Sequence, residues 1–249
     1  MIQLCGRYAV EIEGERVEAA LPGRQGRLLF AYLTLNRDRV VTRSELVDAV
    51  WSREPPRDPG DALAALLSKV RSALGNRYLE GRAELSLALP AGARVDVERA
   101  LGAVHEAESA CSLDDWPRAW SAGLAAQIVA RRPLLPDYES DWIDEWRRTL
   151  DGVLVRSLEC YARACLRLGG TELTAAERAG RQLVRIAPLR ESGYALLMEA
   201  LEAQGNVAEA LVVYETLRVR LRDELGVPPA ETVQSLHRRL LGADSGFRN

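Results

Sequence analysis

Hydrophobic and polar positions follow two different periods along this chain. Tyr8, Val10 and Ile12 alternate with Glu11 and Glu13, which is typical of a half-buried β-strand, and residues 13–15 (EGE) predict a turn back. Residues 24–36 instead repeat large apolar side chains on one face of a helix. The start of the chain therefore combines strands with helices.

A second helix is expected over residues 40–51. Thr42 and Glu45 stand three positions apart, the spacing of a capping box that begins a helix. Residues 52–59 (SREPPRDP) are charged and rich in proline, which predicts a loop.

A third helix and a hairpin complete the first part of the chain. Residues 60–75 repeat leucine or valine at helical spacing and end at a glycine, and residues 78–90 predict a hairpin that turns near Gly81. The order of strand, helix, helix, loop, helix and hairpin predicts an α+β winged helix-turn-helix domain over residues 1–92.

Beyond about residue 96 the pattern is helical throughout. Short Gly, Pro, Asp or Asn breaks separate helical segments at 97–111, 114–131, 140–168, 172–187, 190–204, 206–225 and 229–241. Thr174 with Glu177 and Asn206 with Glu209 are expected to cap two of these helices. GNVAEALVVY, after one helix stop, is typical of tetratricopeptide-type (TPR-like) helix pairs. We therefore expect an all-α, TPR-like domain over residues 93–249.

The third predicted helix has two faces of different chemistry. Its inward face is expected to hold Leu63, Leu67, Val70 and Leu74. Its outward face is expected to hold Asp61, Ala64, Ala65, Ser68 and Ser72, flanked by Lys69 and Arg71. In a winged helix this outward face enters the major groove of DNA.

Five side chains are candidate DNA contacts: Arg43, Ser68, Lys69, Arg71 and Arg82. Arg43 stands at the start of the second helix, where its side chain and backbone N–H groups can meet a phosphate, and Arg82 stands at the wing, where it can enter the minor groove. Each also has a simpler interpretation, as an exposed charge, a surface ion pair or a tolerated small residue.

Charge limits how strongly such a face can bind. The net charge is −3, and the first 92 residues carry 13 basic and 12 acidic side chains. Because neither half is a polycation, any DNA binding depends on a local basic face and is weak for a single copy.

Composition excludes several other classes. With 47% hydrophobic and 28% charged residues the chain is typical of a globular protein, and no apolar run reaches membrane-spanning length. No phosphate-binding glycine loop, nucleophile elbow or metal-ligand spacing of the four cysteines and two histidines is present in the sequence. We therefore expect no enzyme activity, cofactor, metal or membrane contact, and a cytoplasmic location.

Two stretches carry a resemblance to a known family. RQGRLLFAYLTLNRDRVVTRSELVDAVW, with the following loop and KVRSALG, resembles the OmpR-type winged helix of the Streptomyces antibiotic regulatory protein family. RLRDELGVPPAE is similar to part of that family's bacterial transcriptional activator domain. The resemblance covers residues 2–242 and implies an activator that binds direct repeats in double-stranded promoter DNA, as side-by-side protomers or a homodimer, and recruits RNA polymerase.

The resemblance also implies a role for the loop over residues 52–59, which the family uses in polymerase contact. The charged candidates there are Arg53, Glu54, Arg57 and Asp58. They fit equally an ordinary exposed linker.

Departures from the family pattern keep a second hypothesis open. Ala64 and Ala65 stand where the family carries polar readers, and the wing lacks the Pro-Pro-Gly-Tyr stretch expected after Arg82. The alternative is a protein-interaction module whose winged helix has lost sequence-specific DNA binding.

Two tryptophan pairs, Trp116 with Trp120 and Trp142 with Trp146, stand one helical turn apart. They are expected either in the core or along a ligand groove. Residues 131–146, the least regular part of the helical half, are the expected neighbourhood of any effector site.

Overall fold

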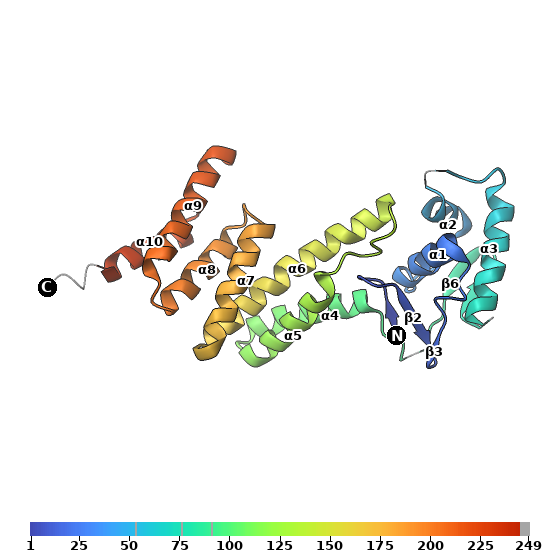
Figure 1. Ribbon diagram of the computed structural model, residues 1–249, viewed down its shortest axis with the longest axis horizontal. Helices are drawn as coiled ribbons and strands as arrows, with labels where there is room; N and C mark the ends of the chain where they lie inside the picture. Colours follow the sequence, from blue (N-terminus) through green and yellow to red (C-terminus); the bar gives the residue numbers. More distant parts are fainter. Residues whose placement is uncertain (53, 76, 91, 245–249) are drawn as a thin grey trace. The chain divides into compact units, whose positions relative to one another are not determined.

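The computed structural model describes residues 1–52, 54–75, 77–90 and 92–244, and its contacts divide the chain into two compact units (Figure 1). The first unit combines Met1–Arg99 with Val129–Leu150, and the second combines Ala100–Ile128 with the chain from Asp151 onward. Arg53 lies outside the described residues.

The first unit begins with a small antiparallel sheet. Its strands β1 (Ile2–Gln3), β2 (Ala9–Ile12) and β3 (Glu15–Arg16) lie in the order β1-β2-β3. Glu13 and Gly14 both have positive φ, 53° and 87°, as a tight two-residue hairpin requires. The strand and the turn predicted from the sequence are confirmed.

Three helices and a second sheet follow. The chain runs through α1 (Gly23–Leu35), β4 (Val41–Thr42), α2 (Arg43–Val50), α3 (Pro59–Leu74), β5 (Leu79–Gly81) and β6 (Glu84–Leu87). The second sheet has the order β4-β6-β5 and is antiparallel.

Local chemistry sets the ends of these elements. Glu45 N–H donates to the Thr42 hydroxyl at 3.3 Å and Thr42 N–H donates to the Glu45 carboxylate at 2.8 Å, so the predicted capping box is confirmed. A Cβ at Gly81 would lie 1.9 Å from the carbonyl oxygen of Glu84, and φ there is +86°, so only glycine fits this turn.

A clamp joins the first strand to the first turn of α4 (Asp96–Ser112). The Asp96 carboxylate accepts backbone N–H groups from Leu4 at 3.0 Å, Cys5 at 2.9 Å and Val97 at 2.9 Å. Each of these donors is partly buried, so the carboxylate replaces water as their acceptor. No local pattern in the sequence signals this clamp.

Residues 129–150 also pack within the first unit. Gly6 N–H donates to the Pro133 carbonyl at 2.8 Å, and the backbone of Cys5 forms an isolated antiparallel β-bridge with that of Leu134. The guanidinium of Arg147 donates to the carbonyls of Leu134 and Tyr138 at 3.0 and 2.8 Å. These bonds satisfy the backbone of an irregular segment and hold it against the N-terminal sheet.

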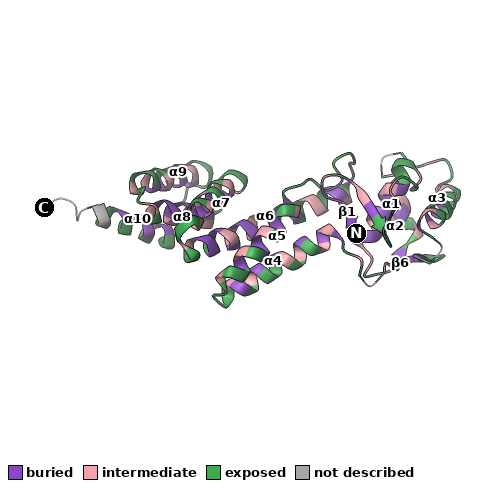
Figure 2. Ribbon diagram, turned by 60° about the horizontal axis from the view of Figure 1, so that its bottom comes forward, coloured by how far each residue is buried: buried purple, intermediate pink, exposed green. Residues whose placement is uncertain are grey.

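The second unit is helical. It holds most of α4, α5 (Trp116–Ala130) and α6 (Asp141–Leu168), whose remaining residues belong to the first unit. It also contains the short 3₁₀ helix η1 (Gly170–Glu172), α7 (Leu173–Ile186), α8 (Glu191–Ala203), α9 (Val207–Leu225) and α10 (Glu231–Asp244). Buried positions form stripes along these helices (Figure 2). A Cβ at Gly180 would lie 2.9 Å from Leu197, so glycine allows α7 and α8 to approach closely.

One core cluster of this unit is built from α8, α9 and α10. Its fully or nearly buried members include Tyr194, Met198, Leu201, Leu217, Val233 and Leu240. The helical periodicity predicted from the sequence is thus confirmed, and it buries a continuous interior.

Two predicted helix caps are wrong. Thr174 lies inside the first turn of α7, because η1 leads directly into that helix and leaves no extended capping residue. Asn206 precedes α9 with φ −90° and ψ 50°, and its side chain makes no capping bond. Glu177 and Glu209 instead both accept from Arg181.

Along the described residues, no helix has both the length and the hydropathy that a membrane crossing requires.

Replacing Asp96 with alanine is expected to lower the free energy of unfolding by about 2–4 kcal/mol, because three partly buried N–H groups lose their acceptor. Urea denaturation of wild type and variant measures this difference. Asp38 is exposed, so Asp38→Ala serves as the control and should cost less than about 0.5 kcal/mol. Equal losses in the two variants would contradict a structural role for the clamp.

Candidate nucleic-acid interface

The outward face of α3 carries small and polar side chains, as expected from the sequence. Leu63, Leu67, Val70 and Leu74 are buried. The exposed residues are Asp61, Ala64, Ala65, Ser68, Lys69 and Ser72. One side of the helix therefore belongs to the core and the other faces solvent.

Arg43 lies between three elements. From the first position of α2 it donates to the carbonyl of Gly60 in the first turn of α3 at 3.2 Å, and more weakly to the carbonyl of Arg82 in the hairpin turn at 3.5 Å. A guanidinium has five N–H donors, so donors remain for a ligand oxygen. The side chain is thus held in place next to the hairpin.

Arg71 connects α3 to the hairpin. Its Nε donates to the carbonyl of Leu79 at 3.2 Å and its second terminal nitrogen donates to that of Gly81 at 2.6 Å. Arg71 is half-buried, so it differs from the exposed flanking charge expected from the sequence. Its main observed role is to fix β5 relative to α3.

Lys69, Ser68 and Arg82 are exposed. Among the described residues, neither Lys69 nor Arg82 forms an ion pair with the acidic residues nearest to it in sequence, which are Asp61 for Lys69 and Glu80 and Glu84 for Arg82. The structure therefore brings the guanidinium groups of Arg43 and Arg71 to backbone carbonyls of the hairpin, and in the described part of the chain neither these two arginines nor Arg82 forms an ion pair.

The candidate polymerase contacts in the loop between α2 and α3 differ in their structural surroundings. Glu54 and Arg57 are exposed, whereas the Asp58 carboxylate accepts the N–H of Asp61 at 3.0 Å and caps α3. Asp58 thus has a structural function, as the N-cap of α3, that the sequence analysis did not predict.

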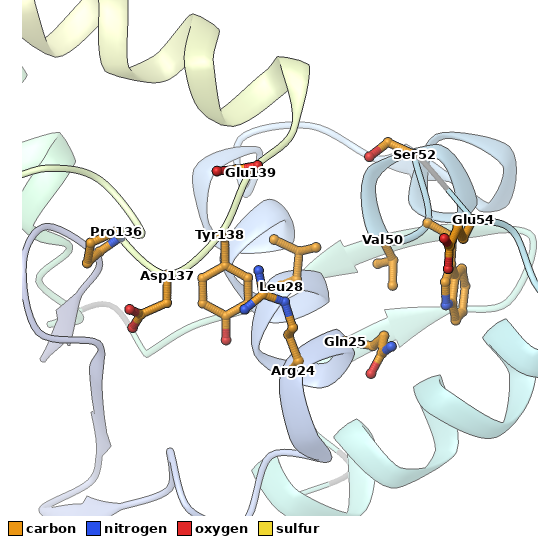
Figure 3. A pocket seen from close by; sticks show the side chains of 11 residues that line it. Arg24, Gln25, Leu28, Val50, Ser52, Glu54, Pro136, Asp137, Tyr138 and Glu139 are labelled. Carbon is orange, nitrogen blue, oxygen red and sulfur yellow. The ribbon is translucent and has the colours of Figure 1, made fainter.

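A hollow of about 500 Å³ lies beside this loop, between α1, the end of α2 and residues 136–139 (Figure 3). The guanidinium of Arg24 stacks 4.3 Å above the ring of Tyr138 there. The hollow overlaps the segment in which the sequence placed an effector site.

The tryptophan pairs were expected either in the core or along a ligand groove, and neither description alone fits them. Trp120 donates its indole N–H to Glu172 at 2.9 Å, and Trp142 donates its own to the carbonyl of Ala49 at 3.1 Å. All four tryptophans are partly exposed, and each of these two spends its polar atom on a fixed protein partner.

Comparisons with known proteins agree on one class. The bacterial transcriptional activator domain family matches residues 95–241. Regulatory protein AfsR of Streptomyces coelicolor is 32% identical across 93% of this chain, and transcriptional regulator RedD of the same species is 30% identical across 88%. The chain spans 23% of the length of AfsR and 64% of RedD.

The fold is similar to that of a solved structure. Mycobacterium tuberculosis EmbR, in complex with a low affinity phosphopeptide, matches with a TM-score of 0.84 at 23% identity. The match covers 97% of this chain and 64% of that one.

Replacing Arg71 with alanine is expected to loosen the hairpin, because the carbonyls of Leu79 and Gly81 lose a shared donor. We expect a loss of about 1–3 kcal/mol in unfolding free energy and faster amide exchange in β5 and β6, measured by hydrogen-exchange NMR.

Lys69→Ala is the matched control, since Lys69 is an exposed cation on the same helix. Its effect on exchange in the hairpin should be small. If Arg71→Ala leaves hairpin exchange at the wild-type rate, Arg71 does not position the hairpin.

Proposed function

Because the chain belongs to the bacterial transcriptional activator domain family and resembles regulators of transcription, we propose that it is an activator that binds promoter DNA and recruits RNA polymerase. Residues 1–92 form the DNA-binding domain in this proposal, and residues 93–249 form the TPR-like activator domain. The protein acts in the cytoplasm, where it is a regulator rather than an enzyme.

The first domain is proposed to be a winged helix-turn-helix. Its support is the order of α1, α2, α3 and the β5–β6 hairpin, with β4 completing the sheet. In this assignment α3 is the recognition helix and the hairpin is the wing. The bonds from Arg71 to Leu79 and Gly81 would then hold wing and recognition helix in one geometry.

The observation that carries the DNA-binding proposal is the exposed face of α3 beside the cations at the hairpin. Lys69 and Ser68 would reach base edges or phosphates in the major groove, and Arg82 would reach the neighbouring minor groove. Arg43 would contact the backbone while keeping its bond to Gly60.

Few cations mean that one copy binds weakly. Two copies on a direct repeat, or a homodimer, would raise the affinity without any new contact on each half-site. The exposed loop residues Glu54 and Arg57 are proposed to contact RNA polymerase, together with Arg53. Asp58 would contribute by fixing the start of α3.

A second function, as a protein-interaction module without sequence-specific DNA binding, is favoured by one observation. Two adjoining positions of the outward α3 face are alanines, and Arg71 spends two of its donors on backbone carbonyls. Few side chains then remain to read bases.

A selection of bound fragments from the source genome, sequenced at low and moderate salt, tests the proposal. We expect enrichment of fragments that share a direct repeat and a steep loss of binding with salt. Lys69→Ala with Arg82→Ala should weaken binding to the enriched fragment at least about tenfold. The slope of log affinity against log salt should become shallower by about 1 for each phosphate that the variant no longer neutralises.

Arg118→Ala with Arg218→Ala removes the same charge from exposed arginines of the second unit, which pair with Glu106 and Glu215. This control should bind like wild type. No enrichment at low salt would refute the DNA-binding proposal and favour the interaction module.

A further inference from the structure

A second groove lies on the first unit, between α2 and the start of α6. It has a volume of about 530 Å³, and its lining includes three aromatic residues, Tyr32, Trp51 and Trp142, and three carboxylates, Glu45, Asp48 and Asp141. No lysine or arginine is among the described residues that line it. The described lining of the groove is therefore rich in aromatic rings, and all its charged side chains are acidic.

The aromatic lining is held by the fold. Trp142 donates its indole N–H to the carbonyl of Ala49 at 3.1 Å, and its ring meets that of Tyr32 edge-on, with centroids 5.2 Å apart and planes at 80°. Trp51 ends α2, where its backbone N–H donates to the carbonyl of Val47 at 2.9 Å. The rings of Tyr32 and Trp142 are thus fixed before any ligand arrives, and the backbone of Trp51 is anchored at the end of α2.

The three carboxylates differ in whether they already have hydrogen-bond or ion-pair partners. Glu45 accepts from Thr42 and from Arg39, at 2.8 and 2.9 Å. Asp48 and Asp141 are exposed, and within the described residues neither side chain has a hydrogen bond or ion pair. Two free negative charges therefore stand beside fixed aromatic faces.

We propose that this groove binds an arginine side chain presented by a segment of a partner protein. A guanidinium is planar and weakly hydrated, so it stacks on tryptophan while its fork of N–H groups bonds to a carboxylate. Trp51 supplies the face, and Asp48 and Asp141 supply the acceptors. The same charges repel phosphate, so a nucleic acid does not fit.

The surroundings suit an extended segment better than an isolated cation. The groove shares Trp51 and Ser52 with the hollow of Figure 3, which carries Glu54 and Asp137 as well as the stacked Arg24. Residues flanking the bound arginine can therefore continue into that hollow. The groove is a different surface from the α3 face, so arginine binding there does not depend on the proposed DNA binding.

The test is a selection of random octapeptides displayed on phage, with the immobilised full-length chain, near 0.15 M salt. We expect arginine to be enriched over lysine in the retained peptides. Asp48→Asn with Asp141→Asn should abolish this preference, and Trp51→Leu should weaken binding of an enriched synthetic peptide about tenfold.

Asp38→Asn with Asp151→Asn changes the net charge equally at exposed positions outside the groove and should retain the enrichment. In ¹H–¹⁵N spectra, the enriched peptide should shift the indole signals of Trp51 and Trp142.

Three results would overturn the proposal. They are no enrichment of arginine, equal enrichment on the Asp48→Asn/Asp141→Asn variant, and binding of free arginine or spermidine as tight as that of the peptide. Binding to DNA fragments, measured in parallel, is expected to be unchanged in the Asp48→Asn/Asp141→Asn variant. Failure of this inference and failure of the proposed function are thus distinguishable.

Discussion

The 16 residues of α3 have to serve the core and the surface at the same time. Five buried apolar side chains, from Leu63 to Leu74, fix the helix in the first unit and decide which residues face outward. Only the outward side is free to vary with function, and here it is short in polar readers. The bonds from Arg71 to the hairpin carbonyls extend this constraint, because they couple the position of the helix to that of β5 and β6.

In the described structure, the residues that position α3 and the hairpin are therefore different from those that are exposed to a ligand. Arg71 and Asp58 complete backbone hydrogen bonds, whereas Lys69, Ser68 and Arg82 are exposed and available to a ligand. In the proposed function, a weak electrostatic face of this kind gains its affinity from repeated sites rather than from a strongly basic surface. The net charge of −3 is compatible with that arrangement because most acidic residues lie in the helical part of the chain.

Local patterns allowed the elements to be predicted, and long-range contacts did not follow from them. The Thr42–Glu45 capping box, the Gly81 turn and the buried stripe of α3 depend on residues within a few positions of one another. The clamp at Asp96 joins residues 92 positions apart, and the carbonyls that Arg147 holds belong to an irregular segment. No periodicity signals such bonds. The caps expected at Thr174 and Asn206 were wrong for a related reason, since the preceding turn decides whether a side chain can reach back. Among the candidate contacts, exposure of the α3 face was predictable, but the commitment of Arg71 to the hairpin was not.

The measurement that tests the central claim most directly is hydrogen exchange of the full chain, with and without a DNA fragment from the genomic selection. If the protein binds DNA through α3 and the hairpin, we expect added protection in α3 and in β5 and β6, with exchange in α8, α9 and α10 unchanged. Protection confined to the helical unit, with α3 unaffected, would contradict this binding mode.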